Sequence, residues 1–123
     1  MKNRRVVVTG IGTICCNGVG KDIFWKSLKE GVSNIDRITS FDPSSLYSQV
    51  AGEARDFNPA DFMDSKEAKR MGRFNHFSLC AAQMALEDAH LTVTDDISTS
   101  TGVLIGSCFG GMITFYEQYQ KFI

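Results

Sequence analysis

The chain of 123 residues is about one domain long, and with 43% apolar and 22% charged residues it has the composition of an ordinary globular protein. Its formal net charge of −1 excludes a global field that would draw it to nucleic acid or to an anionic membrane. No apolar run approaches the ~18 residues of a membrane span. The run near the N-terminus is short and is broken by Gly10 and Gly12, which argues against a secretory signal.

The cysteine pattern predicts neither a metal site nor a bound cofactor. No C-x-x-C pair occurs, and no histidine stands at zinc-ligand spacing from any of the four cysteines, Cys15, Cys16, Cys80 and Cys108. Without an export signal we expect reduced thiols and a bacterial-type cytoplasmic location, or an organelle if a transit peptide has been removed.

The first elements predicted are a strand and a helix. Residues 4–9 are rich in β-branched side chains without interruption, which is typical of a strand buried on both faces. From Lys21 the apolar spacing predicts a helix that ends at Gly31, with Asp22 as its N-cap. Residues 32–62 are rich in turn-forming types and predict a long connection, with a short strand at 48–54.

The second half of the chain predicts more helix. Residues 65–74 are basic and amphipathic, and residues 74–90 form an alanine-rich segment that is apolar on more than one face and therefore predicted to be buried. Residues 101–112 predict a second buried strand that runs into a glycine-rich turn, and 113–123 the start of a helix without a C-terminal cap. This order predicts an α/β fold with a parallel or mixed sheet, in a domain that is incomplete at residue 123.

Two phosphate-binding motifs are matched only in part. Gly10 and Gly12 fit a dinucleotide fingerprint, but Cys15 stands where its third glycine is needed. A P-loop requires Ser or Thr after its Gly-Lys pair, and here Asp22 follows Lys21. A nucleotide-binding α/β domain is therefore a weak alternative.

Thiol catalysis is also disfavoured by the local sequence. Cys15 and Cys16 precede a helix start by a few residues, but no histidine lies near them in the sequence. His76 falls within an apolar helix and His90 at the C-terminal end of that helix, where we expect structural roles.

A basic stretch at residues 66–73 carries the clearest candidate binding surface. Its cations stand three and four residues apart, which on a continuous helix places Lys66, Lys69, Arg70 and Arg73 on one face, with Glu67 as the only acid of the stretch. Docking of an acidic partner and an ordinary solvated face both fit this spacing. Nucleic acid fits less well, because no stacking aromatics alternate with the charges.

Several segments in order resemble one family. "RRVVVTGIG", "FWKSLKEGVSNIDRITSFD", "DFNPADFMDSKEAKRMGRF", the alanine-rich helix and "GVLIGSCFGGM" together resemble the N-terminal portion of β-ketoacyl-acyl-carrier-protein synthases of the KAS I/II type, closest to synthase II. The resemblance covers essentially residues 1–123, as an incomplete part of the N-terminal domain. One departure is the stretch 15–18, Cys-Cys-Asn-Gly, where the family usually has a more rigid "(S/T)PxG" type of turn.

The resemblance implies a fold and a reaction. The family has the thiolase-like fold, with α-β-α-β-α layers, and its members are longer than this chain and work as homodimers. They condense an acyl thioester with malonyl-acyl carrier protein in fatty-acid elongation. An acyl-cysteine intermediate is attacked by the carbanion that forms when the malonyl group loses carbon dioxide, with two histidines assisting.

The family's catalytic cysteine and both histidines lie downstream of the part that this chain resembles. We therefore assign no catalytic residue to any of its six candidates, Cys15, Cys16, Cys80, Cys108, His76 and His90, and expect the chain alone to be inactive. The resemblance implies that Lys66, Lys69 and Arg70 dock the acyl carrier protein. It also implies that Phe109 borders the acyl pocket. The alternative is a non-catalytic module that binds acyl carrier protein.

Overall fold

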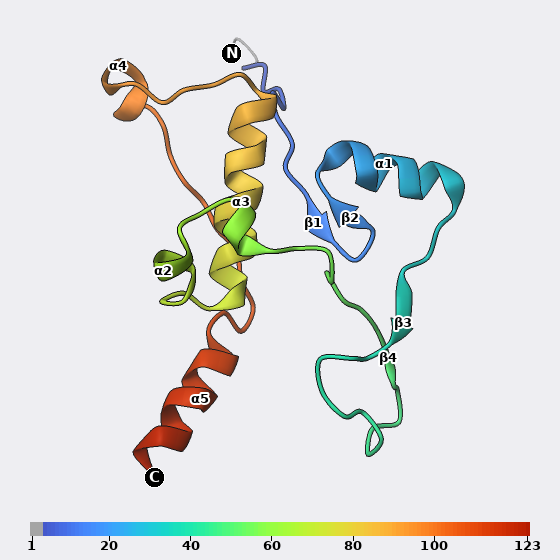
Figure 1. Cartoon of the computed structure of the whole chain (residues 1–123). Coiled ribbons are helices and arrows are strands. Elements are labelled where there is room, and N and C mark those ends of the chain that lie inside the picture. Colours follow the sequence, from blue (N-terminus) through green and yellow to red (C-terminus); the bar gives the residue numbers. More distant parts are fainter. Residues whose placement is uncertain (1–3) are drawn as a thin grey trace.

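The computed structural model describes residues 4–123 and is built around one long helix, α3 (Arg73–Asp88), which Figure 1 shows at the centre of the chain. The elements are, in order, β1 (Ile14–Cys15), β2 (Gly18–Val19), α1 (Lys21–Glu30), β3 (Ile35–Arg37), β4 (Val50–Gly52), the 3-10 turn η1 (Pro59–Asp61), α2 (Ser65–Ala68), α3, α4 (Asp95–Ser98) and α5 (Met112–Phe122). Among the described residues, no helix has both the length and the apolarity needed to cross a membrane.

Helix α1 confirms the prediction for this part of the chain, except at its N-cap. Gly31 ends the helix with φ 65°, and its N–H donates to the Leu28 carbonyl, because glycine adopts the left-handed conformation without steric cost. The N-cap is Gly20, and Asp22 lies inside the first turn without a capping hydrogen bond. The prediction of Asp22 as N-cap is therefore wrong, although a carboxylate in the first turn still complements the helix dipole.

Both sheets are small and antiparallel, so the predicted parallel or mixed sheet is wrong. β1 pairs with β2, with Ile14 opposite Val19, and β3 pairs with β4, with Ile35 opposite Gly52. β4 confirms the short strand predicted within 48–54, whereas β3 was not predicted, because "IDR" alternates too briefly to stand out from its polar surroundings.

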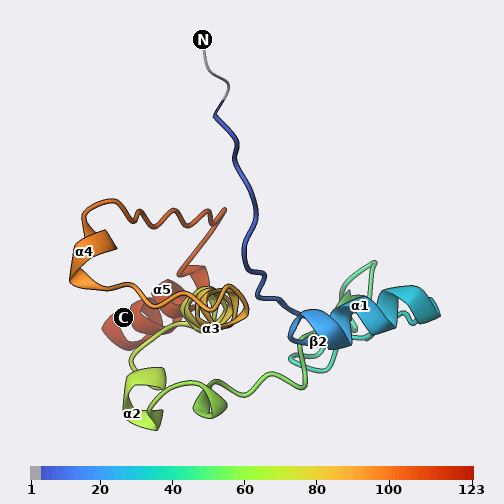
Figure 2. The ribbon, with the colours of Figure 1, turned by 90° about the horizontal axis from the view of Figure 1, so that it is seen from above.

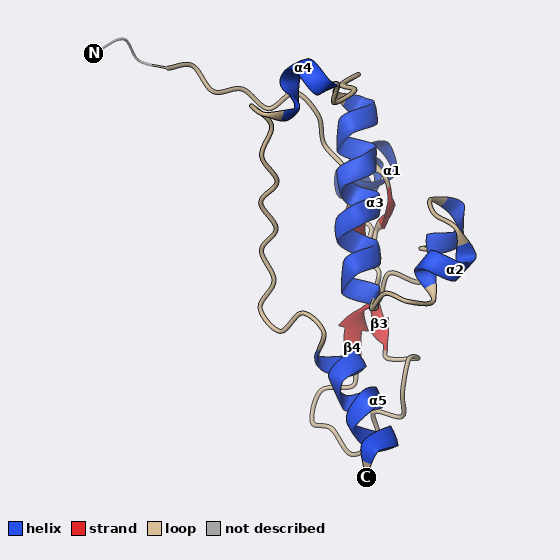
Figure 3. Cartoon of the chain, turned by 90° about the vertical axis from the view of Figure 1, so that its left-hand side faces the viewer, coloured by secondary structure: helices blue, strands red, loops and turns tan. Residues whose placement is uncertain are grey.

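The two apolar segments predicted as buried strands are extended but carry no ladder. Val6 in the first is 92% exposed and Leu104 in the second is 99% exposed. Figure 3 shows the second segment within a long extended loop between α4 and α5. A strand needs hydrogen-bonded neighbours, and no segment of the described chain lies beside either one as a ladder partner.

Helix α3 confirms the predicted alanine-rich helix but is less buried than predicted. Figure 2 looks down its axis and shows that the other elements leave much of its circumference uncovered. His76 and Cys80 are its buried residues, whereas Leu79 and Leu86 are exposed.

The core lies under the N-terminal half of α3. Phe57, which is 5% exposed, packs its ring 5.1 Å from that of Phe77 and 6.0 Å from that of Phe62. Burial of one aromatic side chain contributes about 1.5–3 kcal/mol. This cluster therefore holds the segment before α2 against α3.

Residues 65–74 do not form the continuous basic helix that their spacing predicted. α2 ends at Ala68, and α3 begins at Arg73 after its N-cap Gly72. The chain therefore changes direction between Lys69 and Gly72, and the four cations of this stretch do not share one helical face.

Candidate functional site

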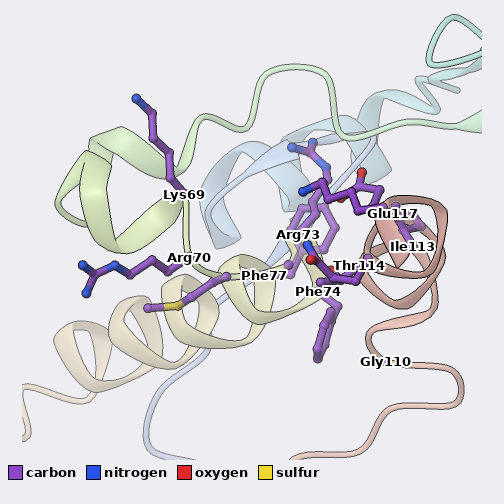
Figure 4. A pocket seen from close by; sticks show the side chains of 13 residues that line it. Lys69, Arg70, Arg73, Phe74, Phe77, Gly110, Ile113, Thr114 and Glu117 are labelled. Atoms are coloured by element: carbon purple, nitrogen blue, oxygen red, sulfur yellow. The ribbon is translucent and has the colours of Figure 1, made fainter. Parts of the chain in front are cut away.

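Three exposed cations lie on α2 and on the turn that follows it. Lys66 belongs to α2, while Lys69 and Arg70 lie in the turn between α2 and α3. We call these residues the basic turn. Figure 4 shows the Lys69 side chain directed away from the ribbon. Within residues 4–123 none of the three forms a salt bridge, so their charges are free to meet a partner.

The basic turn is held in place by two local hydrogen bonds. The Asp64 carboxylate accepts from the Lys66 backbone N–H at 2.8 Å and so caps α2. At the other end, Nε2 of His76 lies 2.8 Å from the Ala68 carbonyl oxygen. Because a carbonyl oxygen only accepts, Nε2 carries the hydrogen and donates it. His76 is 8% exposed, and its contact with Ala68 agrees with the structural role expected for it, which stays a prediction.

Arg73 does not belong to this surface. Its guanidinium lies over the rings of Phe77 and Phe57, 4.9 and 5.5 Å from their centroids, and Nη2 donates to the Ala54 carbonyl at 2.7 Å. Figure 4 shows Arg73 beside Phe77. The prediction that Arg73 shares a face with the other cations is therefore wrong. Its guanidinium makes cation–π contacts and joins α3 to the segment after β4, although the residue is exposed.

A groove of about 620 Å³ separates the basic turn from α5. One wall carries Lys69, Arg70 and the start of α3, and the other is α5 (Figure 4). The two walls meet at Gly72, where an added methyl group would lie 2.8 Å from the Thr114 hydroxyl oxygen. Glycine thus permits the close approach that brings α5 to the basic turn.

Phe109 lies in the bend before α5 and is 73% exposed. Its carbonyl accepts from the Met112 N–H at 3.0 Å, which helps to start α5. The groove is lined by Gly110 but not by Phe109. Its predicted place at the border of an acyl pocket stays a prediction.

The cysteines are all free thiols, and two of them lie at the β1–β2 hairpin. The Cys15 thiol donates to the Gly18 carbonyl at 3.8 Å and that of Cys16 to the Asn17 side-chain oxygen at 3.2 Å. Cys80 is fully buried in α3, and burial raises the pKa of its thiol. In the described part of the chain, no three Cys, His, Asp or Glu residues gather as a metal site would require.

Gly10 and Gly12 pack against α3. A methyl group added at Gly10 would lie 2.0 Å from the Ala85 carbonyl oxygen, and one at Gly12 would lie 1.9 Å from that of Ala81. Both glycines thus bring the backbone onto the alanine face of the helix. This packing argues against the nucleotide-binding alternative, which needs glycine backbone open to a phosphate.

The sequence analysis did not identify the carboxylate that holds the segment around Gly10 and Gly12 against α3. Asp88, at the end of α3, accepts hydrogen bonds from the Lys21 ammonium and, at 3.0 Å, from the Ile11 backbone N–H. These bonds, that of Lys21 first, lower the pKa of Asp88 below its usual range. No spacing rule links residues 67 positions apart, so the sequence carried no signal for this pair.

A second carboxylate organises the loop after β3. Glu53 accepts from the backbone N–H of Thr39 and of Ser40, both at 3.0 Å, and from the Thr39 hydroxyl at 2.8 Å. Arg55 pairs with it at 3.0 Å. The bonds from Ser40 and Thr39 hold the pKa of Glu53 well below its usual range. Glu53 therefore anchors the loop and is not placed as a catalytic acid.

Comparisons with known proteins show the family of the chain. The family model described as "Beta-ketoacyl synthase, N-terminal domain" matches residues 3–122. The chain belongs to this family, which confirms the resemblance seen in the sequence.

Among its relatives, the 3-oxoacyl-[acyl-carrier-protein] synthase 2 of Synechocystis sp. is 42% identical over 118 residues, which are 96% of this chain and 28% of the relative. The synthase 2 of Staphylococcus aureus strain N315 is 41% identical over 122 residues, or 98% of this chain and 29% of the relative. The chain thus spans less than a third of the length of these relatives.

A solved structure is similar as well. The chain titled "The ishigamide ketosynthase/chain length factor" aligns with a TM-score of 0.66 and 37% identity, over 72% of this chain and 22% of that one. This likeness, with the family match, implies a thiolase-like α/β fold.

Proposed function

We propose that this chain forms part of the N-terminal domain of a β-ketoacyl-acyl-carrier-protein synthase. The enzyme has a thiolase-like fold with α-β-α-β-α layers. The reaction is the decarboxylative condensation of an acyl thioester with malonyl-acyl carrier protein in fatty-acid elongation. The observation that carries the proposal is the identity of about 41% to synthases of this name over 98% of the chain. A cytoplasmic location and a homodimeric whole enzyme are parts of the same proposal.

The part of the function proposed for this chain is docking of the acyl carrier protein. Lys66, Lys69 and Arg70 are exposed and free of salt bridges within the described residues, as an electrostatic docking surface requires. The backbone of the turn that bears them is held by hydrogen bonds from Asp64 and His76.

The condensation step itself is not proposed for any residue of this chain. From the resemblance, we expect the family's nucleophilic cysteine and both histidines to correspond to none of its cysteines or histidines. Cys80 is buried, and burial raises the pKa of its thiol. A thiolate nucleophile instead needs a lowered pKa. We expect Phe109 to border the acyl pocket only in the whole enzyme.

The docking proposal is tested by charge reversal. The triple variant Lys66→Glu, Lys69→Glu, Arg70→Glu should abolish binding of holo-acyl carrier protein to this chain, measured by isothermal titration calorimetry at low and at high salt. Lys29→Glu, on exposed α1, is the matched control and should bind like the unmodified chain. Unchanged binding by the triple variant would refute the docking role.

An activity assay tests whether the residues that catalyse the condensation lie outside this chain. Incubated with acyl- and malonyl-carrier substrates and no other polypeptide, the chain should form no new carbon–carbon bond, as mass spectrometry of the carrier would show. A condensation product under these conditions would contradict the assignment of catalysis to residues outside this chain.

A further inference from the structure

Two adjacent thiols lie at the turn of the β1–β2 hairpin, and the proposed docking function does not use them. Cys15 ends β1 and Cys16 follows it, and both are partly exposed free thiols. Their hydrogen bonds are local, since Cys15 donates to the Gly18 carbonyl and Cys16 to the Asn17 side-chain oxygen. Within residues 4–123, neither sulfur has a hydrogen-bond partner outside the hairpin.

A direct disulfide between these two cysteines is disfavoured by geometry. The peptide bond that joins them is trans, so their Cα atoms lie about 3.8 Å apart. The Cα atoms of a disulfide are usually about 4.4–6.8 Å apart. An atom inserted between the two sulfurs relieves this restriction, because the sulfurs then need not come within bonding distance of each other.

Both cysteines line one open cleft of about 720 Å³, which lies between the hairpin, β4 and the start of α3. We call it the dithiol cleft. The Cys16 sulfur faces β4, where a methyl group added at Gly52 would lie 2.8 Å from it. The missing side chain of Gly52 thus leaves room for the sulfur. The apolar side chains of the cleft are those of Ile14, Phe77 and Ile113.

The charged groups that line the dithiol cleft have partners within the described chain. Glu53 pairs with Arg55 at 3.0 Å. The Arg73 guanidinium lies over the Phe77 ring and donates to the Ala54 carbonyl. The cleft therefore offers two sulfurs and an apolar surface, which suits an uncharged ligand that prefers sulfur and carries an apolar group.

We propose that Cys15 and Cys16 form a binding site for monosubstituted trivalent arsenicals, which carry two hydroxyl groups and one apolar group on arsenic. Cysteine sulfur is a soft ligand and prefers a soft acceptor of this kind. Two As–O and two S–H bonds break, two As–S and two O–H bonds form, and two water molecules leave. Neither arsenic nor sulfur changes its oxidation state. The site is independent of the proposed docking function.

This ligand needs only two sulfurs from the protein. Its apolar group occupies the third bond of arsenic, so the two cysteines complete the coordination. No cluster of three ligands is required, and the described residues gather none. The apolar group would lie against the apolar side chains of the dithiol cleft, where it is removed from water.

The test uses the 123-residue chain and phenylarsine oxide, which hydrates to the dihydroxy compound in water. With excess 2-mercaptoethanol as a competing monothiol, intact-mass measurement should show one phenylarsenic group per chain and the loss of two hydrogens. Cys15→Ser and Cys16→Ser should each abolish this adduct, because one sulfur forms no chelate. The double variant Cys80→Ala, Cys108→Ser keeps the pair and should bind like the unmodified chain. Circular dichroism should show that each variant keeps its helix content.

A second measurement tests the dithiol cleft without any variant. The preference for phenylarsine oxide over methylarsonous acid should be about tenfold larger in the folded chain than in urea, because only the folded chain buries the phenyl group. An equal preference in both states would overturn the role of the cleft. An adduct that either serine variant retains, or that the unmodified chain does not form, would overturn the assignment to the cysteine pair.

Discussion

Asp88 joins three distant parts of the chain through one carboxylate. It lies at the end of α3, bonds the ammonium of Lys21 at the start of α1, and accepts from the Ile11 N–H in the segment that crosses α3. Hydrogen bonds to a charged form favour that form, so the pKa of Asp88 is lowered and that of Lys21 is raised.

These pKa directions predict how stability depends on pH. The lowered pKa of Asp88 contributes stability above its unfolded pKa of about 3.9, and this stability is lost as the pH falls through the lower folded value. The raised pKa of Lys21 contributes stability below about 10.4, which is lost as the pH rises through the higher folded value. Asp88→Asn should therefore lower the urea midpoint by a constant amount between about pH 5 and pH 9.

The control for this prediction is Asp56→Asn, since the Asp56 side chain is exposed and takes part in no salt bridge among the described residues. In strong acid the difference between Asp88→Asn and the unmodified chain should vanish, because Asp88 is then protonated in both folded and unfolded states. A midpoint difference as large at pH 2 as at pH 7 would contradict the role given to the carboxylate.

At the scale of elements, the segment through Gly10 and Gly12 is matched to the alanine face of α3. Small residues on both sides let the backbone approach the helix, which explains why a glycine-rich turn and an alanine-rich helix occur together in this chain. The same glycines had suggested a nucleotide fingerprint, and their side-chain space is filled by α3 instead.

This packing predicts that one glycine cannot be replaced by alanine without loss of stability, whereas another can. Gly12→Ala should destabilise the chain by about 1–3 kcal/mol, because its methyl group would overlap the Ala81 carbonyl and force the segment away from α3. Gly106→Ala is the control, since a methyl group there meets no atom within 4 Å, and it should be neutral or slightly stabilising. Urea unfolding monitored by circular dichroism measures both. Equal stability of the two variants would show that the close approach is unimportant.

At the scale of the whole molecule, the described chain exposes a large apolar surface. Val103 and Leu104 are 85% and 99% exposed, Val6 is 92% exposed, and α5 exposes Phe122 and Phe115. Exposed apolar surface of this extent usually marks an interface. The chain spans less than a third of the length of the relatives it matches, and we propose that in them further residues cover the corresponding surface.

We expect the 123-residue chain to self-associate at micromolar concentration. Sedimentation velocity should show species larger than a monomer, and the double variant Val103→Lys, Leu104→Lys should shift the distribution towards monomer. Lys26→Glu, on exposed α1, is the charge-changing control. A monodisperse, cooperatively unfolding monomer at these concentrations would contradict the expectation.

Sequence patterns within a few residues were sufficient to predict the elements that local interactions stabilise. The helix that ends at Gly31, the alanine-rich helix α3, the start of α5 and the short strand β4 all follow from periodicity, glycine conformation or turn chemistry within a few residues. Ordered motifs along the chain also determined the family, because such a series is specific even where each motif alone is weak.

Only the tertiary structure decided what depends on distant partners. The predicted strands at 4–9 and in 101–112 have no ladder, the Arg73 guanidinium lies over Phe57 and Phe77, and Lys121 lies across a groove from the basic turn. The physical reason is common to all three. A ladder, a cation–π contact and a groove each require groups far apart in the sequence, and residue spacing does not specify which of those groups meet.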